Sequence, residues 1–295
     1  MQYYERGNSI LVGNILDSMT EQYNKLTRSG KKLADYIFSN TAGAQYMSIT
    51  SLAENCGVSE ATITRFCRGL GLTGYNDLKL ALAKADRTTD LGDPCGTPQT
   101  INLNDDLETL CRKLHTSNII SLNETLEYLD ESALMAAIDI LSYARNIYCF
   151  GQGGSMVTAM EAWARFSTVA PNFIHIADSH MQLMTTALLN SCDALLFFSY
   201  SGATTDMEDI LQAAHNNGVK IILVTHFKKS AAAELADVVL LCGYNESPLQ
   251  SGSIAAKIGQ MFLIDCLFYG FCQKNPKLSA EARNTTSSAL MKKLL

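Results

Sequence analysis

Two short turns rich in hydroxyl groups and glycine could bind an anion in this chain. Residues 199–204, Ser-Tyr-Ser-Gly-Ala-Thr, follow the apolar run 194–198 and precede a helix-like segment that begins near Asp206. The free N–H groups and the macrodipole at a helix N-terminus favour negative charge, and Ser and Thr hydroxyls add neutral donors around a phosphate. A second turn of this kind, residues 151–155, follows the apolar run 147–150. Together the two turns predict a binding site for a small phosphorylated ligand.

Short apolar strands must position these turns. Five apolar runs are each followed by a turn and a helix-like pattern: residues 147–150, 173–176, 194–198, 220–224 and 238–241. Short, nearly continuous apolar runs separated by helices are typical of a parallel sheet that is covered on both faces. Ligands of such sheets bind beyond the carboxyl ends of the strands, which is where both turns fall.

The part of the chain before the strands contains only helical patterns. They cover residues 30–40, 49–56, 60–70, 75–85 and, in one long stretch, about 103–144. Residues 88–99 hold two of the five prolines and two glycines without apolar periodicity, as expected of an interdomain linker. We predict a helical domain over residues 1–86, a linker over 87–102 and an α/β domain over 103–295.

Length and composition fit a globular protein of two domains. The chain has 295 residues, and single cores stop growing near about 250 to 300 residues. No apolar run approaches the roughly 18 residues that span a bilayer, and the first residues lack a signal-peptide core, so we expect a cytoplasmic protein with no membrane partner. The nine cysteines show no metal-ligand spacing. We therefore expect reduced, mostly buried thiols, no metal site and no cofactor.

Charge is shared unevenly along the chain. The net charge is −6, yet residues 25–84 carry eight Lys and Arg against four Asp and Glu. A locally basic region in an acidic protein fits a nucleic-acid contact that is confined to one face.

The spacing within residues 48–70 predicts a helix-turn-helix. Gly57 can take the left-handed conformation that a tight turn needs, and Ser59 can cap the next helix. Ile63, Phe66 and Leu70 form a stripe at helical spacing that would be buried. The polar side chains would then face solvent or a DNA major groove, where Arg can read guanine edges or hold phosphates. The candidate DNA contacts are Ser48, Ser59, Glu60, Thr62, Thr64, Arg65 and Arg68. The alternative is an ordinary helical hairpin with a solvated basic face.

These patterns resemble a family of bacterial regulators. The N-terminal part is similar to the DNA-binding domain of RpiR-type transcriptional regulators over residues 26–37, 47–71 and 78–83. The rest resembles the sugar isomerase (SIS) domain that follows in that family, over residues 150–155, 178–182, 199–204 and 257–265. The resemblance covers nearly the whole chain. It implies an all-α helix-turn-helix domain followed by an α/β three-layer sandwich with a flavodoxin-like, five-stranded parallel sheet.

The resemblance also implies a function. Proteins of this family bind a phosphorylated sugar or sugar acid in the SIS domain and change their DNA affinity in response. The expected partners are double-stranded operator DNA, a phosphorylated sugar effector and further copies of the chain. By position, the phosphate contacts would be Gly153, Ser155, Ser199, Tyr200, Ser201, Gly202 and Thr204. Alternatively, these hydroxyls only cap helices.

The chain departs from the family at two positions. Ala203 stands where Glu is usual, which removes a carboxylate beside the ligand, and Lys257 stands where Arg is common. Further candidate ligand contacts are His175, Glu246 and Lys257. His175 and Glu246 could also move a proton between sugar carbons, but acid/base work needs a paired geometry that the sequence does not display. We therefore expect no enzymatic activity.

Two alternatives for the whole protein remain. One is a regulator of carbohydrate metabolism, and the other is a sugar-phosphate isomerase or lyase whose helical head serves only assembly. The head favours the regulator, because an isomerase would not need it. Palindromic operators call for a two-fold protein, so we expect a homodimer or homotetramer with subunit contacts at the apolar helices around residues 254–271 and 290–295.

Overall fold

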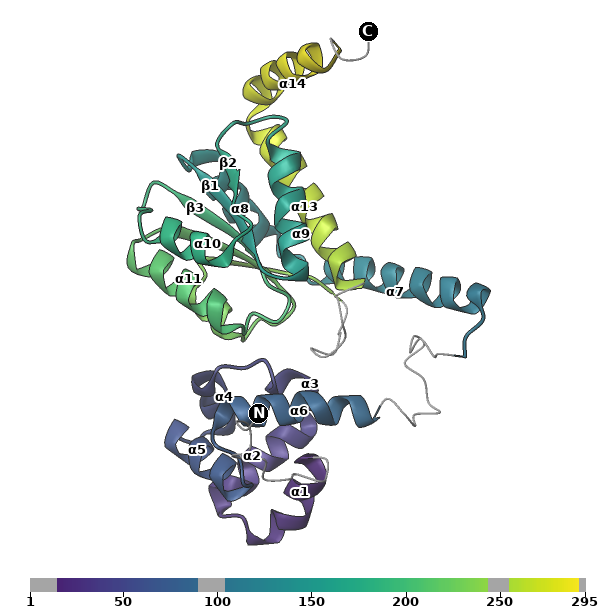
Figure 1. Cartoon of the computed structure of the whole chain (residues 1–295), viewed down its shortest axis with the longest axis vertical. Coiled ribbons are helices and arrows are strands. Elements are labelled where there is room, and N and C mark those ends of the chain that lie inside the picture. Colours follow the sequence, from purple (N-terminus) through teal and green to yellow (C-terminus); the bar gives the residue numbers. More distant parts are fainter. Residues whose placement is uncertain (1–14, 90–103, 244–254, 292–295) are drawn as a thin grey trace, which may run out of the picture. The chain divides into compact units, whose positions relative to one another are not determined.

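The computed structural model describes residues 15–89, 104–243 and 255–291, and the chain divides into two compact units (Figure 1). The described part of the first unit, residues 15–89, is helical. The described part of the second unit, residues 104–243 and 255–291, contains a parallel sheet with helices around it. A helical head and an α/β body therefore match the fold class that the sequence predicts.

The helices of the first unit close one apolar core. In chain order they are α1 (Ile15–Gln22), the 3-10 helix η1 (Tyr23–Lys25), α2 (Arg28–Ser39), α3 (Thr41–Ala44), α4 (Ile49–Cys56), α5 (Glu60–Gly69) and α6 (Tyr75–Thr89). Leu33, Leu52 and Ile63 are fully buried where α2, α4 and α5 meet. Because α6 continues to Thr89, it includes the first residues of the predicted linker. The other linker residues up to 102 lie outside the described ranges, so the domain boundaries stay a prediction.

The second unit alternates strands and helices after two leading helices. In chain order they are α7 (Leu107–Glu127), α8 (Glu131–Tyr143), β1 (Ile147–Gly151), α9 (Gly154–Phe166), β2 (Phe173–His175), α10 (Ser179–Thr186), β3 (Ala194–Phe198), α11 (Thr205–Asn216), β4 (Lys220–Thr225), α12 (Ala231–Leu235), β5 (Val238–Leu241), α13 (Ala255–Lys274) and α14 (Pro276–Met291). The predicted single stretch over 103–144 is two helices. Asp130 causes the break, because its carboxylate accepts hydrogen bonds from the N–H groups of Ser132 and Ala133 and so begins α8.

The sheet is parallel throughout, with strand order β2-β1-β3-β4-β5. Alternate residues of β3 enter different cores: Leu196 and Phe198 face α8, α9 and α13, whereas Leu195 and Phe197 face the side of α10, α11 and α12. Burial on both faces explains why the strands read as continuous apolar runs. Figure 1 shows the helices on the two sides of the sheet, so the three-layer sandwich is confirmed.

One helix among the described residues, α13, is long and apolar enough to cross a membrane by length and composition alone. Half of that apolar stretch is buried inside the protein. Leu263, Leu267 and Phe271 pack in the core between the sheet and the neighbouring helices. The composition of α13 is therefore that of a core helix, and most of its apolar side chains are not free to form the predicted subunit surface.

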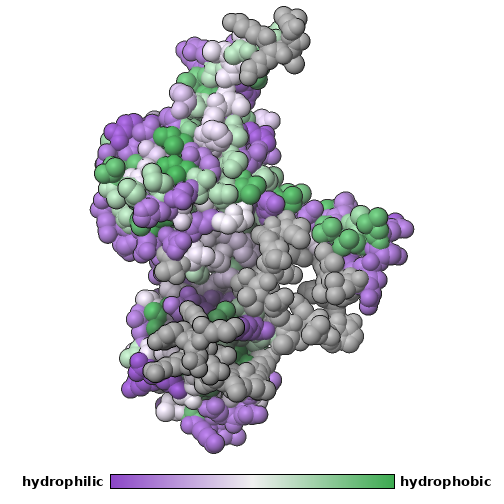
Figure 2. Space-filling model, viewed as in Figure 1, coloured by the Kyte–Doolittle hydropathy of each residue, from purple (hydrophilic) through white to green (hydrophobic). Residues whose placement is uncertain are grey.

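By contrast, α7 exposes apolar side chains. Its buried residues are the small polar Ser117, Ser121 and Thr125, which lie where α7 packs against α13. The exposed large apolar residues of α7 are Leu107, Ile119, Leu122 and Leu126. Figure 2 shows hydrophobic surface over the outer end of this helix, at the right of the view.

Candidate functional site

Helices α4 and α5 and the turn between them form a helix-turn-helix. Ser48 begins α4 by accepting a hydrogen bond from the N–H of Ser51 at 2.9 Å. Gly57 then adopts φ 60° and ψ 45°, a left-handed conformation that favours glycine. Ser59 begins α5 by accepting a hydrogen bond from the N–H of Thr62 at 3.3 Å. The turn and the cap that the sequence predicts from Gly57 and Ser59 are confirmed.

The second of these helices, α5, separates apolar and polar faces. Ile63 and Phe66 are buried in the core of the head. On the other face Glu60, Arg65 and Arg68 are exposed, and Thr62 and Thr64 are half-buried. Arg65 Nη2 donates to Thr62 Oγ1 at 3.4 Å. The polar face of α5 thus exposes two cations, Arg65 and Arg68.

The polar groups around α5 also bind one another. Thr50 donates to a carboxylate oxygen of Glu60 at 2.6 Å, which ties α4 to the start of α5. Thr64 Oγ1 donates to the backbone carbonyl of Glu60 at 3.1 Å. Because Ser48 and Ser59 cap the two helices, both hydroxyls have a structural role besides any contact with DNA.

The carboxyl ends of β1 and β3 lie side by side in the second unit. Gly151, the last residue of β1, pairs with Phe198, the last residue of β3. The chain then leaves the two strands toward opposite faces of the sheet, since α9 packs on one face and α11 on the other. At such a reversal of strand order an open parallel sheet forms a ligand crevice. Both candidate phosphate turns, 151–155 and 199–204, begin at this point.

Hydrogen bonds from side chains to the backbone shape the turn 199–204. The buried Ser199 Oγ accepts from the N–H of Gly202 at 3.1 Å, and Ser201 Oγ accepts from the N–H of Ala203 at 3.4 Å. Each hydroxyl keeps its own proton to donate. Thr204 precedes α11, is exposed, and makes no capping hydrogen bond with its side chain. The turn therefore presents hydroxyl donors at the start of a helix.

The last residue of β4 and the segment between β4 and α12 support this turn. The carbonyl of Tyr200 accepts from Thr225 Oγ1 at 3.0 Å and from the N–H of His226 at 3.1 Å. The Tyr200 ring stacks on the His226 ring, with 5.4 Å between ring centroids. Ser230, which caps α12, lies behind Gly202. We did not predict these supporting residues, although Thr225 repeats the signal of a hydroxyl directly after an apolar strand.

The turn 151–155 is fastened by a buried amide. Gln182 Nε2 donates to the carbonyls of Gly151 at 3.3 Å and of Ile176 at 2.7 Å, and so joins the ends of β1 and β2. Gly153 precedes α9 with φ 55°, and Ser155 lies half-buried in the first turn of that helix. Gln182 belongs to a motif that we recognised, but its role in holding the turn was not predicted.

The three further candidate contacts have different positions. His175 ends β2, on the side of β1 away from β3; its Nδ1 lies 2.9 Å from the carbonyl oxygen of Cys149. A carbonyl only accepts, so Nδ1 carries a proton, and the buried Nε2 has no hydrogen-bond partner among the described residues. Lys257 is half-buried in the first turn of α13. Glu246 lies outside the described residues.

No metal centre is evident in the described part of the chain, where no group of three or more His, Cys, Asp or Glu side chains could hold an ion. The described cysteines are free thiols. Burial raises the pKa of Cys56 and of Cys67 to about 11, so both thiols stay protonated and unreactive near neutral pH.

Two family models match this chain. The helix-turn-helix domain of the rpiR family matches residues 13–89, and the SIS domain matches residues 140–269. These matches coincide with the helical head and with most of the α/β body.

Whole-length relatives are transcriptional regulators. An HTH-type transcriptional regulator of Haemophilus influenzae is 32% identical, over 95% of this chain and 97% of the relative. The HTH-type transcriptional regulator HexR of Pseudomonas aeruginosa is 29% identical, over 87% of this chain and 88% of the relative.

Solved structures share the fold. The Vibrio vulnificus NanR protein, complexed with ManNAc-6P, superposes with a TM-score of 0.80 and 25% identity, covering 95% of this chain and 98% of NanR. The sugar isomerase domain of an RpiR transcription factor from Sphaerobacter thermophilus matches with a TM-score of 0.56 and 20% identity, covering 61% of this chain and 98% of that domain.

Proposed function

Because the chain belongs to the RpiR family of helix-turn-helix transcriptional regulators and carries a SIS domain, we propose that its affinity for operator DNA responds to a phosphorylated sugar bound at the carboxyl edge of the sheet. The genes it controls would then belong to carbohydrate metabolism.

The observation that carries this proposal is the meeting of the two turns 151–155 and 199–204 beside the paired ends of β1 and β3. Each turn precedes a helix, so backbone N–H groups and the helix macrodipole favour an anion there. The first turn of α9 contains no acidic residue, whereas the first turn of α11 contains Asp206 and Glu208. The complex of NanR with ManNAc-6P supports a sugar phosphate as the class of ligand.

We assign the phosphate to the hydroxyl and amide donors of the two turns. They are Gly153, Ser155, Ser199, Tyr200, Ser201, Gly202 and Thr204. His175 Nε2 can accept a hydrogen bond from a sugar hydroxyl, because Nδ1 already donates to Cys149. Lys257 can add a positive charge, and Glu246 remains a proposed contact. In this proposal the ligand is an effector and is not turned over, as the names of the relatives support.

DNA binding is proposed for the outward face of α5. Arg65 and Arg68 would contact bases or phosphates, and Glu60, Thr62 and Thr64 would contribute polar contacts. The proposed assembly is a homodimer or homotetramer, because a palindromic operator requires two heads. The exposed apolar side chains of α7, such as Leu122 and Leu126, suit a contact between subunits better than the buried ones of α13.

A thermal-shift screen of the purified protein tests the ligand site. The panel contains sugar phosphates and their unphosphorylated counterparts, applied to the wild type, to Ser201→Ala and to Ser288→Ala as a control on the exposed face of α14. A ligand at about 100 times its Kd stabilises the folded state by ~2.7 kcal/mol, or about 5 to 10 °C for a domain of this size. We expect such a shift only with a phosphorylated sugar, and expect Ser201→Ala to reduce it.

Two results would contradict the proposed ligand. One is a wild-type protein that no phosphorylated sugar stabilises. The other is a shift that is equally large with the unphosphorylated sugar, because the phosphate then contributes nothing to binding.

A further inference from the structure

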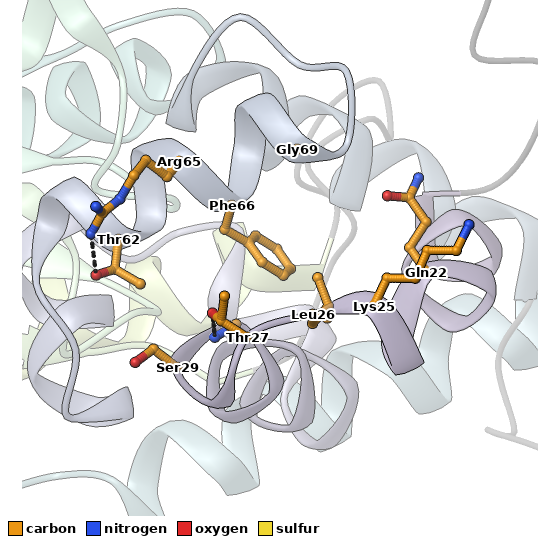
Figure 3. A pocket seen from close by; sticks show the side chains of 10 residues that line it. Gln22, Lys25, Leu26, Thr27, Ser29, Thr62, Arg65, Phe66 and Gly69 are labelled. Carbon is orange, nitrogen blue, oxygen red and sulfur yellow. Dashed lines mark hydrogen bonds between the residues drawn. The ribbon is translucent and has the colours of Figure 1, made fainter.

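A hollow of about 500 Å³ lies beside the helix that we assign to DNA reading (Figure 3). The end of α1 and η1 supply one wall, the first turn of α2 supplies the second, and α5 supplies the third. Phe66 points into the space between Arg65 at one end and Lys25 at the other (Figure 3). The hollow thus begins at the polar face of α5 and extends toward the start of α2.

The lining of this hollow is complementary to an anion. Among the described residues that line it, the charged ones are Lys25 and Arg65, both cationic, and none is a carboxylate. The hydroxyls of Thr27, Ser29 and Thr62 add neutral groups that can donate hydrogen bonds. Within the part of the chain that the structure describes, the walls therefore combine positive charge with polar donors.

The first turn of α2 adds backbone donors to this wall. Thr27 Oγ1 accepts from the N–H of Gly30 at 3.1 Å, which caps the helix (Figure 3). Ser29 lines the hollow, and its N–H group has no acceptor within the helix, because the first turn of any helix lacks one. Together with Lys25, this residue forms a second end of the hollow that can hold an anion, opposite the end formed by Arg65.

The position beside α5 identifies the occupant. A major groove about 12 Å wide is filled by one α-helix, so the two phosphodiester strands run along the flanks of that helix. Arg65 belongs both to the polar face of α5 and to the wall of the hollow. A duplex that meets α5 therefore brings one backbone strand against the hollow.

We propose that this hollow seats the sugar-phosphate backbone of one operator strand, with a phosphate held between Lys25 and the first turn of α2 on one side and Arg65 on the other. The proposal rests on the DNA-binding function proposed above. It makes Arg65 a phosphate contact and leaves base reading to other residues of α5, of which Arg68 is the remaining cation. The phosphate contact positions the head on the duplex without reading sequence.

The test measures binding of the full-length protein by fluorescence anisotropy at several salt concentrations. The probes are a duplex selected from a random library by the wild type and a scrambled duplex of the same length. The variants are Lys25→Gln, Ser29→Glu and, as a matched control outside the hollow, Lys84→Gln on the exposed face of α6. An acidic residue in the first turn of a helix is stabilised by the helix macrodipole, so we expect Ser29→Glu to leave α2 and the fold of the head intact.

We expect Lys25→Gln to weaken binding of both duplexes by the same factor and to reduce the slope of log affinity against log salt by about 1. Between about 50 and 200 mM salt, the loss of affinity then becomes about fourfold smaller than in the wild type. Ser29→Glu should weaken the binding of both duplexes further, because it places a carboxylate beside a DNA phosphate. Lys84→Gln should change the salt slope less than Lys25→Gln does.

Three results overturn the inference. If the wild type binds DNA but Lys25→Gln and Ser29→Glu leave both the affinity and the salt slope unchanged, the hollow does not hold the backbone. If Lys25→Gln weakens only the selected duplex, Lys25 reads bases instead. If selection with the wild type enriches no duplex from the random library, the proposed DNA-binding function fails together with this inference.

Discussion

The backbone of Gly202 has φ 59°, and a Cβ atom built on this residue would clash with the side chain of Ser230. Two separate causes therefore require glycine: a left-handed conformation and the close approach of α12. The N–H of Gly202 also donates a hydrogen bond to Ser199 Oγ. The same residue therefore orients a hydroxyl that we assign to ligand binding.

We expect Gly202→Ala to lower the free energy of unfolding by about 2 to 5 kcal/mol, since the left-handed conformation costs about 1 to 2 kcal/mol and overpacking a further 1 to 3 kcal/mol. The loss is measured from the unfolding transition of the second unit in urea. Gly154→Ala is the matched control, because Gly154 is the first residue of α9 and a Cβ atom added there would meet nothing within 4 Å. Equal stability of the two variants would show that the Gly202 turn relaxes freely.

Single residues differ in how far the sequence alone predicts their roles. Gly57 and Ser59 were predictable, because a turn and a cap depend on neighbours within three or four positions. Ser230 and Gln182 were not, because they contact turns about 30 residues away and their spacing along the chain carries no sign of the contact. Hydroxyl residues directly after apolar strands predict a phosphate site from the sequence alone. The distant side chains that hold those turns in place cannot be predicted in this way.

At the scale of elements, β1 and β3 are joined at their amino ends by a buried carboxylate. Asp193 is 1% exposed, and it accepts hydrogen bonds from Arg145 at 2.7 Å and from Asn146 at 3.2 Å. Burial alone would raise the pKa of Asp193, but the hydrogen bonds from Arg145, the N–H of Asn190 and Asn146 outweigh it and lower the pKa. The contact sets the register of the two strands whose other ends carry the phosphate turns.

Asp193→Asn should destabilise the second unit by about 1.5 to 3 kcal/mol at pH 7, because it removes hydrogen bonds to a charged group. A lowered folded-state pKa stabilises the protein above the unfolded pKa of about 3.9, and that stabilisation is lost as pH falls through the folded value. Denaturation curves of both proteins between about pH 7 and pH 3 should therefore converge as the solution becomes acidic. The exposed Asp209→Asn on α11 is the control. A stability difference that stays constant down to pH 3 would contradict the assigned role of the carboxylate.

Helices and strands could be predicted from the sequence where their buried apolar positions recur at a regular spacing. The runs 194–198 and 238–241 became β3 and β5 with the same limits, because both faces of a central sheet are apolar. The stretch 103–144 that the sequence predicts as helical contains two helices, α7 and α8, because Asp130 starts a new helix and the apolar pattern does not show that start. α1 and η1 were not predicted, and with them the wall of the hollow around Lys25 was missed.

At the scale of the whole molecule, the two units carry separable chemistry. The cations Arg65 and Arg68 belong to the head, and the hydroxyls Ser199 and Ser201 belong to the body. If a ligand in the body changes the DNA affinity of the head, the coupling is a free energy shared by both binding reactions, typically ~1 to 3 kcal/mol or about 5- to 150-fold. Linkage then requires that DNA change the affinity for the ligand by the same factor.

This reciprocity gives the last prediction, on Arg68→Ala and Ser201→Ala. Arg68→Ala should weaken DNA binding and keep the wild-type affinity for the sugar phosphate. Ser201→Ala should weaken binding of the sugar phosphate and keep the DNA affinity of the unliganded protein. Calorimetric titration of the sugar phosphate into the wild type, with and without saturating operator duplex, should give two Kd values. Their ratio should equal the ratio of DNA affinities with and without the ligand. With Arg68→Ala, at a duplex concentration that saturates only the wild type, the two ligand Kd values should coincide, because the duplex is no longer bound. If the wild type gives the same ligand Kd with and without the saturating duplex, ligand and DNA binding are uncoupled, and the proposed coupling between body and head is wrong.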